Sequence, residues 1–207
     1  MQRPARLAVL VSGGGTTLQN FIDRIASGSL RAEIAVVIAS RADAYGLERA
    51  RCAGIPALVV ARKEQADAEQ FNDALHRALE PFAVDLVILA GFLSLFQPRD
   101  RYAGRVMNIH PALIPAFCGS GFYGERVHRA VIESGVRISG CTVHFADDQY
   151  DHGPIILQGT VPVLDDDTPE TLAARIHSLE QELYPEAVRL WTEGRLRIEG
   201  RRVRILE

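Results

Sequence analysis

A short apolar run that ends in a glycine-rich turn most constrains the fold of this chain. Residues 7–11 are all apolar, and Ser12, Gly13, Gly14 and Gly15 follow directly. An apolar run without alternation is typical of a strand buried on both faces, as in parallel sheets covered by helices. Apolar residues then recur at helical spacing over residues 18–25, and we expect Thr16 or Thr17 to cap that helix. The first 25 residues therefore predict a strand, a turn and a helix.

Apolar runs and helical patterns go on alternating through the first half of the chain. Strands are predicted at residues 34–39, 57–60 and 84–91, and helices at residues 46–52 and 66–79. Such alternation is typical of an α/β fold whose mostly parallel sheet carries helices on both faces. We therefore expect a doubly wound, Rossmann-like sheet in an N-terminal half of about residues 1–100.

The pattern changes in the C-terminal half, about residues 101–207. Thr168 and Pro169 are typical of a helix start, and we expect Pro185 to kink or split the helix that follows. Residues 196–205 alternate apolar and charged side chains and predict a hairpin that covers a sheet edge. Because no linker or repeat interrupts residues 1–207, we expect a single domain. The remaining predicted segments are strands at 106–109, 140–145 and 155–163, and a long loop rich in proline, glycine and aromatic residues at 111–124.

Composition and charge exclude several classes of protein. A net charge of −3 leaves no basic excess for gripping a nucleic-acid backbone. The first apolar run is too short for a secretion signal or a membrane span. Cys52, Cys118 and Cys141 form no CxxC pair, which argues against a disulfide scaffold or a structural zinc site and fits a reducing compartment. We expect a cytoplasmic protein that binds neither nucleic acid nor membranes.

The glycine turn is a candidate phosphate site. Residues 12–17 place backbone N–H groups and two threonine hydroxyls at a helix N-terminus, which favours an anion. Leu18 stands where the dinucleotide fingerprint needs its third glycine, so a turn that binds nothing stays open as a reading. Arg41 follows the second predicted strand, where NADP-binding folds often hold an arginine. An NADP oxidoreductase and a nucleotide-binding module therefore remain alternatives.

Two polar side chains end the strand predicted before the long loop. Asn108 and His110 are two residues apart and so point to the same side of the strand, and Pro111 stops the strand directly after them. Asp151 lies in a loop between two later strands and is expected to bring a carboxylate to His110. Such a neighbour is expected to raise the imidazole pKa, so that His110 acts as an acid or an electrostatic stabiliser. Asn108 is then suited to hydrogen-bond a developing oxyanion.

Other readings of the polar residues compete with this one. Cys118 near His110 would suit a thiol nucleophile, although a small loop hydrophobe is the simpler reading. His144 alternates with apolar neighbours, which predicts a buried core histidine that supports the site. Glu180 is expected on the solvated face of the long C-terminal helix. Four residues that could ligate a metal lack the spacing of a known metal motif: His110, His144, Asp151 and His152.

Five strings of the sequence together resemble a known family. They are VSGGGTTLQ at 11–19, AYGLERA at 44–50, LAGF at 89–92, NIHPALIP at 108–115 and DHGPIILQ at 151–158. The last two resemble strings of the folate-dependent formyltransferases. The first two point to the branch of that family that acts on phosphoribosylglycinamide in purine biosynthesis. The resemblance runs over nearly the whole chain.

The resemblance implies a chemistry and a set of residues. The enzyme would move the formyl group of its co-substrate 10-formyltetrahydrofolate to the amine of phosphoribosylglycinamide, without a metal. Asn108 would polarise the formyl oxygen, His110 would stabilise or protonate the tetrahedral intermediate, and Asp151 would keep His110 charged and shuttle protons. The implied nucleotide contacts are Gly14, Gly15, Thr16, Thr17 and Glu180. The implied folate contacts are Leu93, Ser94, Leu95, Phe96, Asn108, Asp147, Asp148 and Asp151.

Three positions depart from the pattern of the family. Ala68 stands where some relatives carry an arginine near the folate, Thr17 stands where asparagine is frequent, and residues 117–124 form a longer, glycine-rich loop. A 10-formyltetrahydrofolate hydrolase using the same three residues is the nearest alternative. We expect neither it nor a methionyl-tRNA formyltransferase, because both usually carry an additional domain for which these 207 residues leave no room.

Overall fold

The computed structural model describes residues 3–207 and divides into two compact units. The first runs to Met107 and the second from Asn108 to Glu207. This division falls close to the boundary near residue 100 that the sequence pattern predicts. That both units belong to one domain stays a prediction.

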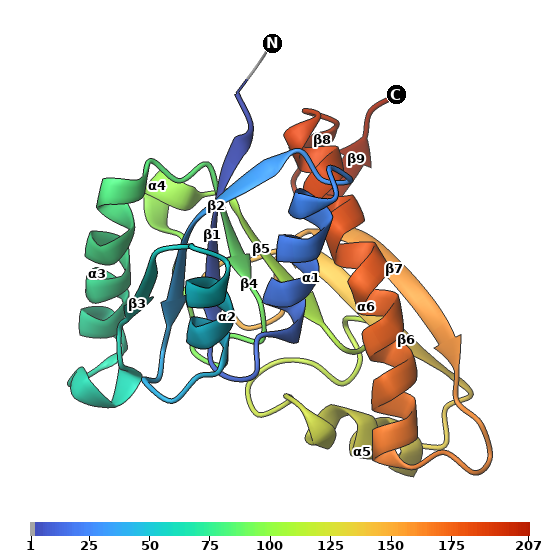
Figure 1. Ribbon diagram of the computed structural model, residues 1–207. Coiled ribbons are helices and arrows are strands. Elements are labelled where there is room, and N and C mark those ends of the chain that lie inside the picture. The colour runs from blue at the N-terminus through green and yellow to red at the C-terminus, as the bar shows by residue number, and fades with distance from the viewer. Residues whose placement is uncertain (1–2) are drawn as a thin grey trace. The chain divides into compact units, whose positions relative to one another are not determined.

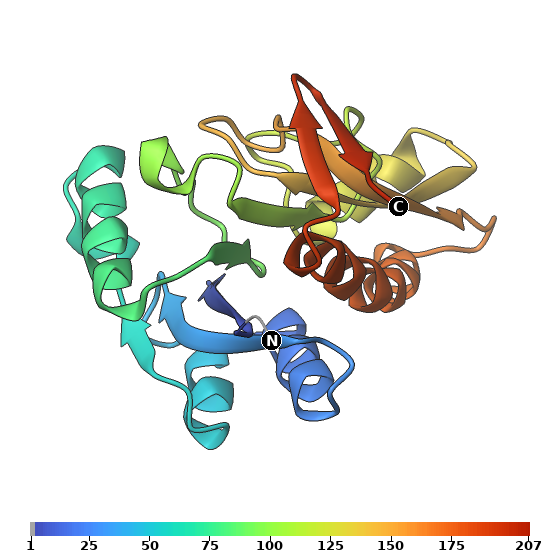
Figure 2. The ribbon, with the colours of Figure 1, turned by 90° about the horizontal axis from the view of Figure 1, so that it is seen from above.

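The first unit is a parallel sheet in the strand order β3-β2-β1-β4 (Figure 1). Its doubly wound α/β topology is the predicted one, since α1 and α2 cover one face and α3 lies on the other (Figure 2). The elements are β1 (Ala5–Val11), α1 (Thr16–Ala26), β2 (Ala32–Ala39), α2 (Gly46–Cys52), β3 (Ala57–Val59), α3 (Ala68–Leu79), β4 (Leu86–Leu89) and α4 (Arg99–Tyr102), with short 3₁₀ turns at Arg62–Glu64 and Glu80–Phe82.

The carboxyl ends of β1 and β4 lie side by side at the point where the strand order reverses. Residues 7–11 of β1 are fully buried, as their unbroken apolar run predicts. The chain passes from β1 to β2 on one side and returns through α3 to β4 on the other. Open α/β sheets bind their ligands at this kind of switch point.

The start of α1 differs from the prediction. Neither Thr16 nor Thr17 caps the helix; the N-cap is Gly15, in the left-handed region at φ 71°, and it forms no side-chain cap. A glycine adopts this conformation without the steric cost that a β-carbon brings. The turn therefore leaves the first N–H groups of α1 without a threonine acceptor.

The second unit is a mixed sheet in the order β5-β6-β7-β9-β8. Strands β6 and β7 are antiparallel, whereas β9 joins β7 in parallel through the pair Ile155 and Arg202. Helix α6 packs on β6 and β7, with α5 beside its N-terminal part (Figure 1). The elements are β5 (Val106–His110, which starts in the first unit), α5 (Glu125–Glu133), β6 (Ile138–Phe145), β7 (Ile155–Pro162), α6 (Pro169–Thr192), β8 (Leu196–Glu199) and β9 (Arg202–Ile205).

In this unit the helix around Pro185 is not split, one helix was not predicted, and the predicted hairpin is confirmed. Helix α6 runs through Pro185 as one element, so the expected split does not occur. Helix α5 was not predicted, because only Val127, His128 and Val131 of its nine residues are buried and its N-cap is a glycine that forms no side-chain cap. The C-terminal hairpin is formed as predicted and extends the sheet at β7.

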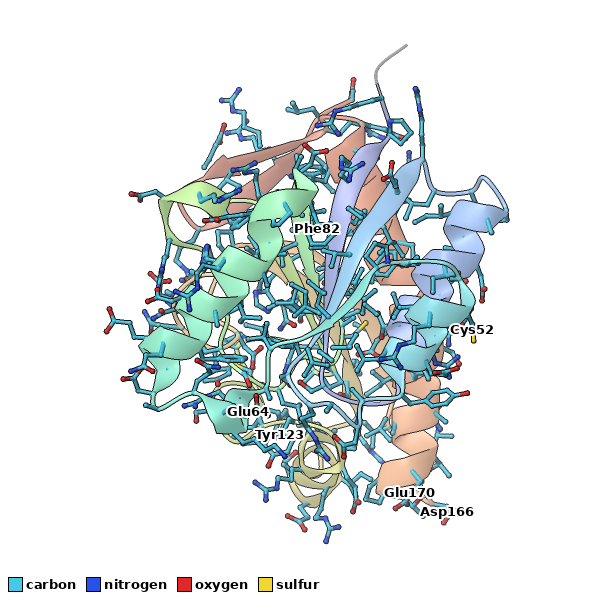
Figure 3. The ribbon with its side chains drawn as sticks, turned by 60° about the vertical axis from the view of Figure 1, so that its left-hand side comes forward. Cys52, Glu64, Phe82, Tyr123, Asp166 and Glu170 are labelled. Carbon is cyan, nitrogen blue, oxygen red and sulfur yellow. The ribbon has the colours of Figure 1, made fainter. Side chains whose placement is uncertain are left out.

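The cysteines and the helices bear on the expected absence of a disulfide scaffold and of a membrane span. Cys52 is exposed at the end of α2 (Figure 3), Cys118 is half-buried and Cys141 is buried, and all three are free thiols. Across residues 3–207, no helix combines the length and the apolar character that a membrane span requires.

Candidate functional site

His110, the last residue of β5, is the centre of a buried polar cluster in the second unit. Its side chain is only 4% exposed. Nε2 lies 2.8 Å from the carbonyl oxygen of Phe117, and Nδ1 lies 3.3 Å from Oδ2 of Asp151. Pro111 ends the strand directly after it, as predicted, and so leaves the imidazole at the strand end.

Asp151 joins His110 to the loop that follows β5. Its Oδ2 accepts the backbone N–H of Gly119 at 2.9 Å, and its Oδ1 accepts an amide proton of Asn108 at 3.2 Å. Asp151 has a φ of 52°, a left-handed conformation that aspartate tolerates better than most residues. The three residues implied by the resemblance therefore lie together, although Asp151 is remote from the other two in sequence.

Asn108 also binds His144 of β6, which fixes the state of that histidine. Nδ1 of His144 lies 2.9 Å from the carbonyl oxygen of Phe145, which can only accept, so Nδ1 carries a proton. Nε2 of the neutral ring then accepts from Nδ2 of Asn108 at 3.1 Å. His144 is therefore buried and fully hydrogen-bonded, as predicted, and it orients the Asn108 amide.

Burial sets the electrostatics of the pair formed by His110 and Asp151. Desolvation lowers the pKa of His110 below its ordinary value and outweighs the opposing effects of the Asp151 charge and the Phe117 carbonyl. The Asp151 charge raises the pKa of His110 as expected, but the expected net rise is wrong because burial has the larger effect. Burial raises the pKa of Asp151, but the charge of His110 and the backbone N–H of Gly119 help to bring that pKa below its ordinary range. Asp151 is thus ionised at neutral pH.

The loop after His110 covers both members of the pair. Phe117 adopts a left-handed φ of 51°, which points its carbonyl at Nε2 of His110. Two residues later, the N–H of Gly119 points at Asp151. Non-glycine residues in this region cost free energy and are held by their surroundings. The loop is long and glycine-rich in sequence, but no residue pattern signals these two contacts.

A buried threonine connects the two sequence strings that carry the resemblance. The hydroxyl of Thr142 donates to the carbonyl of Ala112 at 2.7 Å and accepts the N–H of Ile114 at 3.1 Å. The side-chain amide of Gln158 donates to the same hydroxyl at 3.0 Å and to the carbonyl of Ile114 at 3.1 Å. The string that begins at Asn108 and the string that begins at Asp151 are thereby fixed to each other. No sequence pattern marks Thr142 beyond its place on a buried strand.

Glu180 and His128 add further buried polar groups to the second unit. The Glu180 side chain is 14% exposed, so the expectation of a solvated face is wrong, and it lies 3.2 Å from Nδ1 of His177. His128 on α5 is 6% exposed, and within residues 3–207 its Nδ1 has no hydrogen-bond partner. Burial lowers the pKa of His128, and the charge of Glu180 opposes that shift.

Cys118 is poorly suited to the nucleophilic role that the sequence left open. Its thiol donates to the carbonyl of Pro115 at 3.3 Å. Burial, together with the charge of Asp151, raises the pKa of the Cys118 thiol. A raised pKa disfavours the thiolate that attacks in thiol enzymes.

The glycine turn of the first unit is shaped by a close approach to α2. A β-carbon on Gly15 would lie 2.7 Å from the Cα of Gly46, so position 15 needs glycine or a shift of backbone. Arg49 donates to the carbonyl of Gly14 at 2.8 Å and to Gln19 at 3.1 Å, which orients the turn from the α2 side. The strings at 11–19 and 44–50 therefore form one structure, with exposed Gly14 and Thr16 beside the helix N-terminus.

The predicted folate segment at residues 93–96 is held at the switch point of the first unit. The hydroxyl of Ser12 accepts the N–H of Leu93 at 2.9 Å. Buried Asn72 of α3 donates to the carbonyl of Leu95 at 3.2 Å and accepts the N–H of Gln97 at 2.7 Å. Leu93 itself is 53% exposed, so its side chain is free to meet a ligand.

The remaining candidates have partners elsewhere. Asp147 binds His152 at 2.7 Å rather than the cluster around His110, and Asp148 is exposed. Arg41, the residue that left an NADP oxidoreductase as an alternative, is exposed and paired with Asp43 at 2.7 Å. The described part of the chain, residues 3–207, contains no group of three or more His, Cys, Asp or Glu side chains arranged to hold a metal ion.

Comparisons with known proteins place the chain in a family. The model of the formyl transferase family matches residues 5–188. A phosphoribosylglycinamide formyltransferase of Haemophilus influenzae is 42% identical over 94% of this chain and 90% of its own length. The structure of glycinamide ribonucleotide transformylase 1 from Symbiobacterium toebii is 48% identical, with a TM-score of 0.93 over 100% of this chain and 96% of that one. The phosphoribosylglycinamide formyltransferase of Coxiella burnetii is 36% identical, with a TM-score of 0.89 over 98% of this chain and 94% of that one. The chain belongs to the formyl transferase family.

Proposed function

We propose that this protein transfers the formyl group of 10-formyltetrahydrofolate to the amine of phosphoribosylglycinamide, a step of purine biosynthesis. The observation that carries the proposal is the buried cluster of Asn108, His110 and Asp151. It occurs in a chain that aligns with almost the whole length of two relatives named for this activity.

The reaction requires stabilisation of one oxyanion, removal of a proton from the amine and addition of a proton to N10. The amine nitrogen bonds to the formyl carbon, and the formyl oxygen becomes an oxyanion. The intermediate collapses when the bond from this carbon to N10 of the folate breaks. The amine loses one proton, and N10 gains one. Hydrogen-bond donors directed at the oxyanion and a base near the amine are the groups that lower such a barrier.

His110 supplies the donor in this proposal. Its Nε2 faces the carbonyl oxygen of Phe117 and its Nδ1 faces Asp151, and because both partners only accept hydrogen bonds, the protonated ring donates to both. The formyl oxygen takes the place of the Phe117 carbonyl as the acceptor for the Nε2 proton. The growing negative charge of the oxyanion then favours the imidazolium, against the effect of burial.

Asp151 supplies the base, and Asn108 supplies a second donor. Asp151 is ionised and lies 3.3 Å from His110, so a proton accepted from the amine has a short route to the departing N10. Asn108 uses Nδ2 to bind Asp151 and His144, and one of these bonds exchanges for the formyl oxygen when substrate binds. His144 keeps the amide oriented during that exchange.

The binding residues follow from the family and from local geometry. The unpaired N–H groups of the glycine turn, with Thr16 and Thr17, hold the phosphate of the nucleotide, and Glu180 contacts the nucleotide. The folate contacts are residues 93–96 and the loop from Asp147 to Asp151, with Asn108. No residue of this set requires a metal, and we place the protein in the cytoplasm.

A donor assay tests this function. The protein is incubated with 10-formyltetrahydrofolate, with and without phosphoribosylglycinamide, and release of tetrahydrofolate is followed. We expect release only when the nucleotide is present, and none from the His110→Ala variant in either condition. Release that ignores the nucleotide identifies a hydrolase instead. No release from folded wild-type protein contradicts formyl transfer altogether.

A further inference from the structure

The loop that carries Asp151 is held from outside by the C-terminal hairpin. Arg201, in the turn between β8 and β9, donates from Nη2 to the carbonyl of His152 and from Nη1 to Nε2 of His152, both at 2.9 Å. Nδ1 of His152 lies 2.7 Å from Oδ2 of Asp147. His152 is the residue directly after Asp151, and Asp147 begins the same loop.

The partners of His152 define its tautomer. A carboxylate only accepts hydrogen bonds, so the nitrogen facing Asp147 carries the proton. A guanidinium only donates, so the nitrogen facing Arg201 is bare. His152 is therefore a neutral ring that connects Arg201 of the hairpin to Asp147 at the start of the loop.

The loop has few other restraints along its middle. Residues 148–150 are exposed. At one end, Oδ1 of Asp147 accepts the N–H of Gln149 at 2.9 Å. At the other end, Gly153 lies so close to β6 that a β-carbon there would be 1.9 Å from the carbonyl oxygen of Phe145. Asp151 sits between these ends in a left-handed conformation that its surroundings must maintain.

Sheet register explains why a hairpin residue reaches this loop. Strand β9 pairs with β7 at Arg202 and Ile155. Arg201 precedes the first of these residues and His152 lies three positions before the second, so the pairing brings the two side by side. Two arginines of the hairpin strands, Arg197 and Arg204, pair within the hairpin with Glu199 instead.

We propose that Arg201 is a positioning residue for the reaction: it clamps the loop from Asp147 to His152 and so holds Asp151, and the formyl donor bound along this loop, in register. The part of this inference that concerns the formyl donor rests on the proposed function. The contacts are partly exposed, with side-chain exposures of 46% for His152 and 38% for Asp147, so the effect is moderate rather than absolute.

The test compares Arg201→Ala with Arg204→Ala, which removes an exposed arginine from the same hairpin without touching the loop. The first readout is NMR on the free protein. In wild type and in Arg204→Ala, the ¹⁵N shifts of His152 should show the proton on Nδ1, and the amides of residues 148–151 should be ordered. In Arg201→Ala, the order parameters of these amides should fall toward about 0.6, the range of flexible loops.

The second readout is steady-state kinetics. For Arg201→Ala, kcat/KM for 10-formyltetrahydrofolate should fall about threefold to tenfold while KM for phosphoribosylglycinamide stays unchanged. Arg201→Lys, which offers a single point donor in place of the planar fork, should recover part of the loss. Arg204→Ala should behave as wild type.

The outcomes distinguish a failure of the Arg201 clamp from a failure of the proposed function. If Arg201→Ala matches Arg204→Ala in loop order and in kcat/KM, the clamp is wrong. A proton on Nε2 of His152 in wild type also overturns it. If the wild type transfers no formyl group, the proposed function fails, and the order parameters and the His152 shifts still decide the clamp.

Discussion

Nδ1 of His110 and Oδ2 of Asp151 lie 3.3 Å apart, and the loop after His110 contacts both side chains. The pair is therefore already formed in the free protein, with its outer hydrogen-bonding positions occupied by the backbone of Phe117 and Gly119. In the proposed mechanism, substrate replaces the Phe117 contact of His110 and does not have to assemble the pair.

Removing either member of the pair should abolish most activity without unfolding the protein. For His110→Ala and Asp151→Asn we expect turnover to fall by about two to four orders of magnitude, the range for loss of a general acid, base or oxyanion donor. Initial rates of formyl transfer measure the loss, and circular dichroism checks the fold. Wild-type rates in either folded variant would rule out the proposed mechanism.

The pKa of His110 should depend on Asp151 in a defined direction. In wild type, burial holds this pKa below 6.5, and the Asp151 charge partly offsets the effect. In Asp151→Asn the offset is lost, so the pKa of His110 should fall further. NMR titration of the imidazole gives both midpoints, with His177, whose pKa is raised by Glu180, as an internal reference. A higher midpoint in Asp151→Asn would contradict this account of the electrostatics.

Stability should fall on acidification because of buried histidines such as His128. The folded-state pKa of His128 lies below its ordinary value of 6.5, so below that pH the unfolded chain binds more protons than the folded one. The folded state is therefore favoured above pH 6.5 and loses stability as the pH falls below that value. His128→Gln, which cannot titrate, should lose less stability between about pH 7.5 and pH 5.5. Urea unfolding at the two pH values checks this, and an equal or greater loss in the variant would count against it.

A methyl group at Gly15 should damage the glycine turn, whereas one at Gly14 should not damage the fold. The added carbon of Gly15→Ala meets Cα of Gly46 at 2.7 Å, and the residue has a φ of 71°. We expect a loss of about 1–3 kcal/mol in unfolding free energy and a raised KM for the nucleotide. Gly14→Ala meets nothing within 4 Å and should keep wild-type stability. Equal stability of the two variants would show that the close approach to α2 is unimportant.

Loss of the Thr142 hydroxyl should lower the free energy of unfolding. Thr142→Val keeps the shape but leaves the carbonyl of Ala112 and the N–H of Ile114 without this partner in a buried region. A cost of about 1–3 kcal/mol in unfolding free energy is expected from such unpaired groups. Thr160→Val, on an exposed position of β7, serves as the control and should change little. Indistinguishable urea midpoints for the two variants would contradict this role for Thr142.

Local patterns predicted the elements that form from contiguous signals. The unbroken apolar run at residues 7–11 gave β1, and the residues 46–52 gave α2 with the bounds found in the structure. Pro185 shows the limit of such rules, because tertiary packing keeps α6 continuous through a residue that disfavours helix interiors. Helix α5 follows the long loop and begins at a glycine N-cap without a capping side chain, so no local signal marks its start.

The proximity of Asn108, His110 and Asp151 was predictable from the sequence, but the energetics of the cluster was not. Asn108 and His110 share a strand face, and Asp151 was placed near them through sequence strings and family resemblance. The sign of the pKa shift at His110 depends on burial, which the sequence does not reveal. The contacts from Phe117, Gly119 and Thr142 involve backbone groups or a residue type found in many strands, so nothing in the sequence marks them.

The most direct test of the central claim follows the formyl carbon itself. The protein is mixed with 10-formyltetrahydrofolate labelled with ¹³C in the formyl group and with phosphoribosylglycinamide, and the label is observed by NMR. We predict that the label appears as a formamide on the glycinamide nitrogen at the rate at which tetrahydrofolate forms, and that His110→Ala abolishes both signals. Label appearing as free formate, or transfer that persists in folded His110→Ala, would contradict the account.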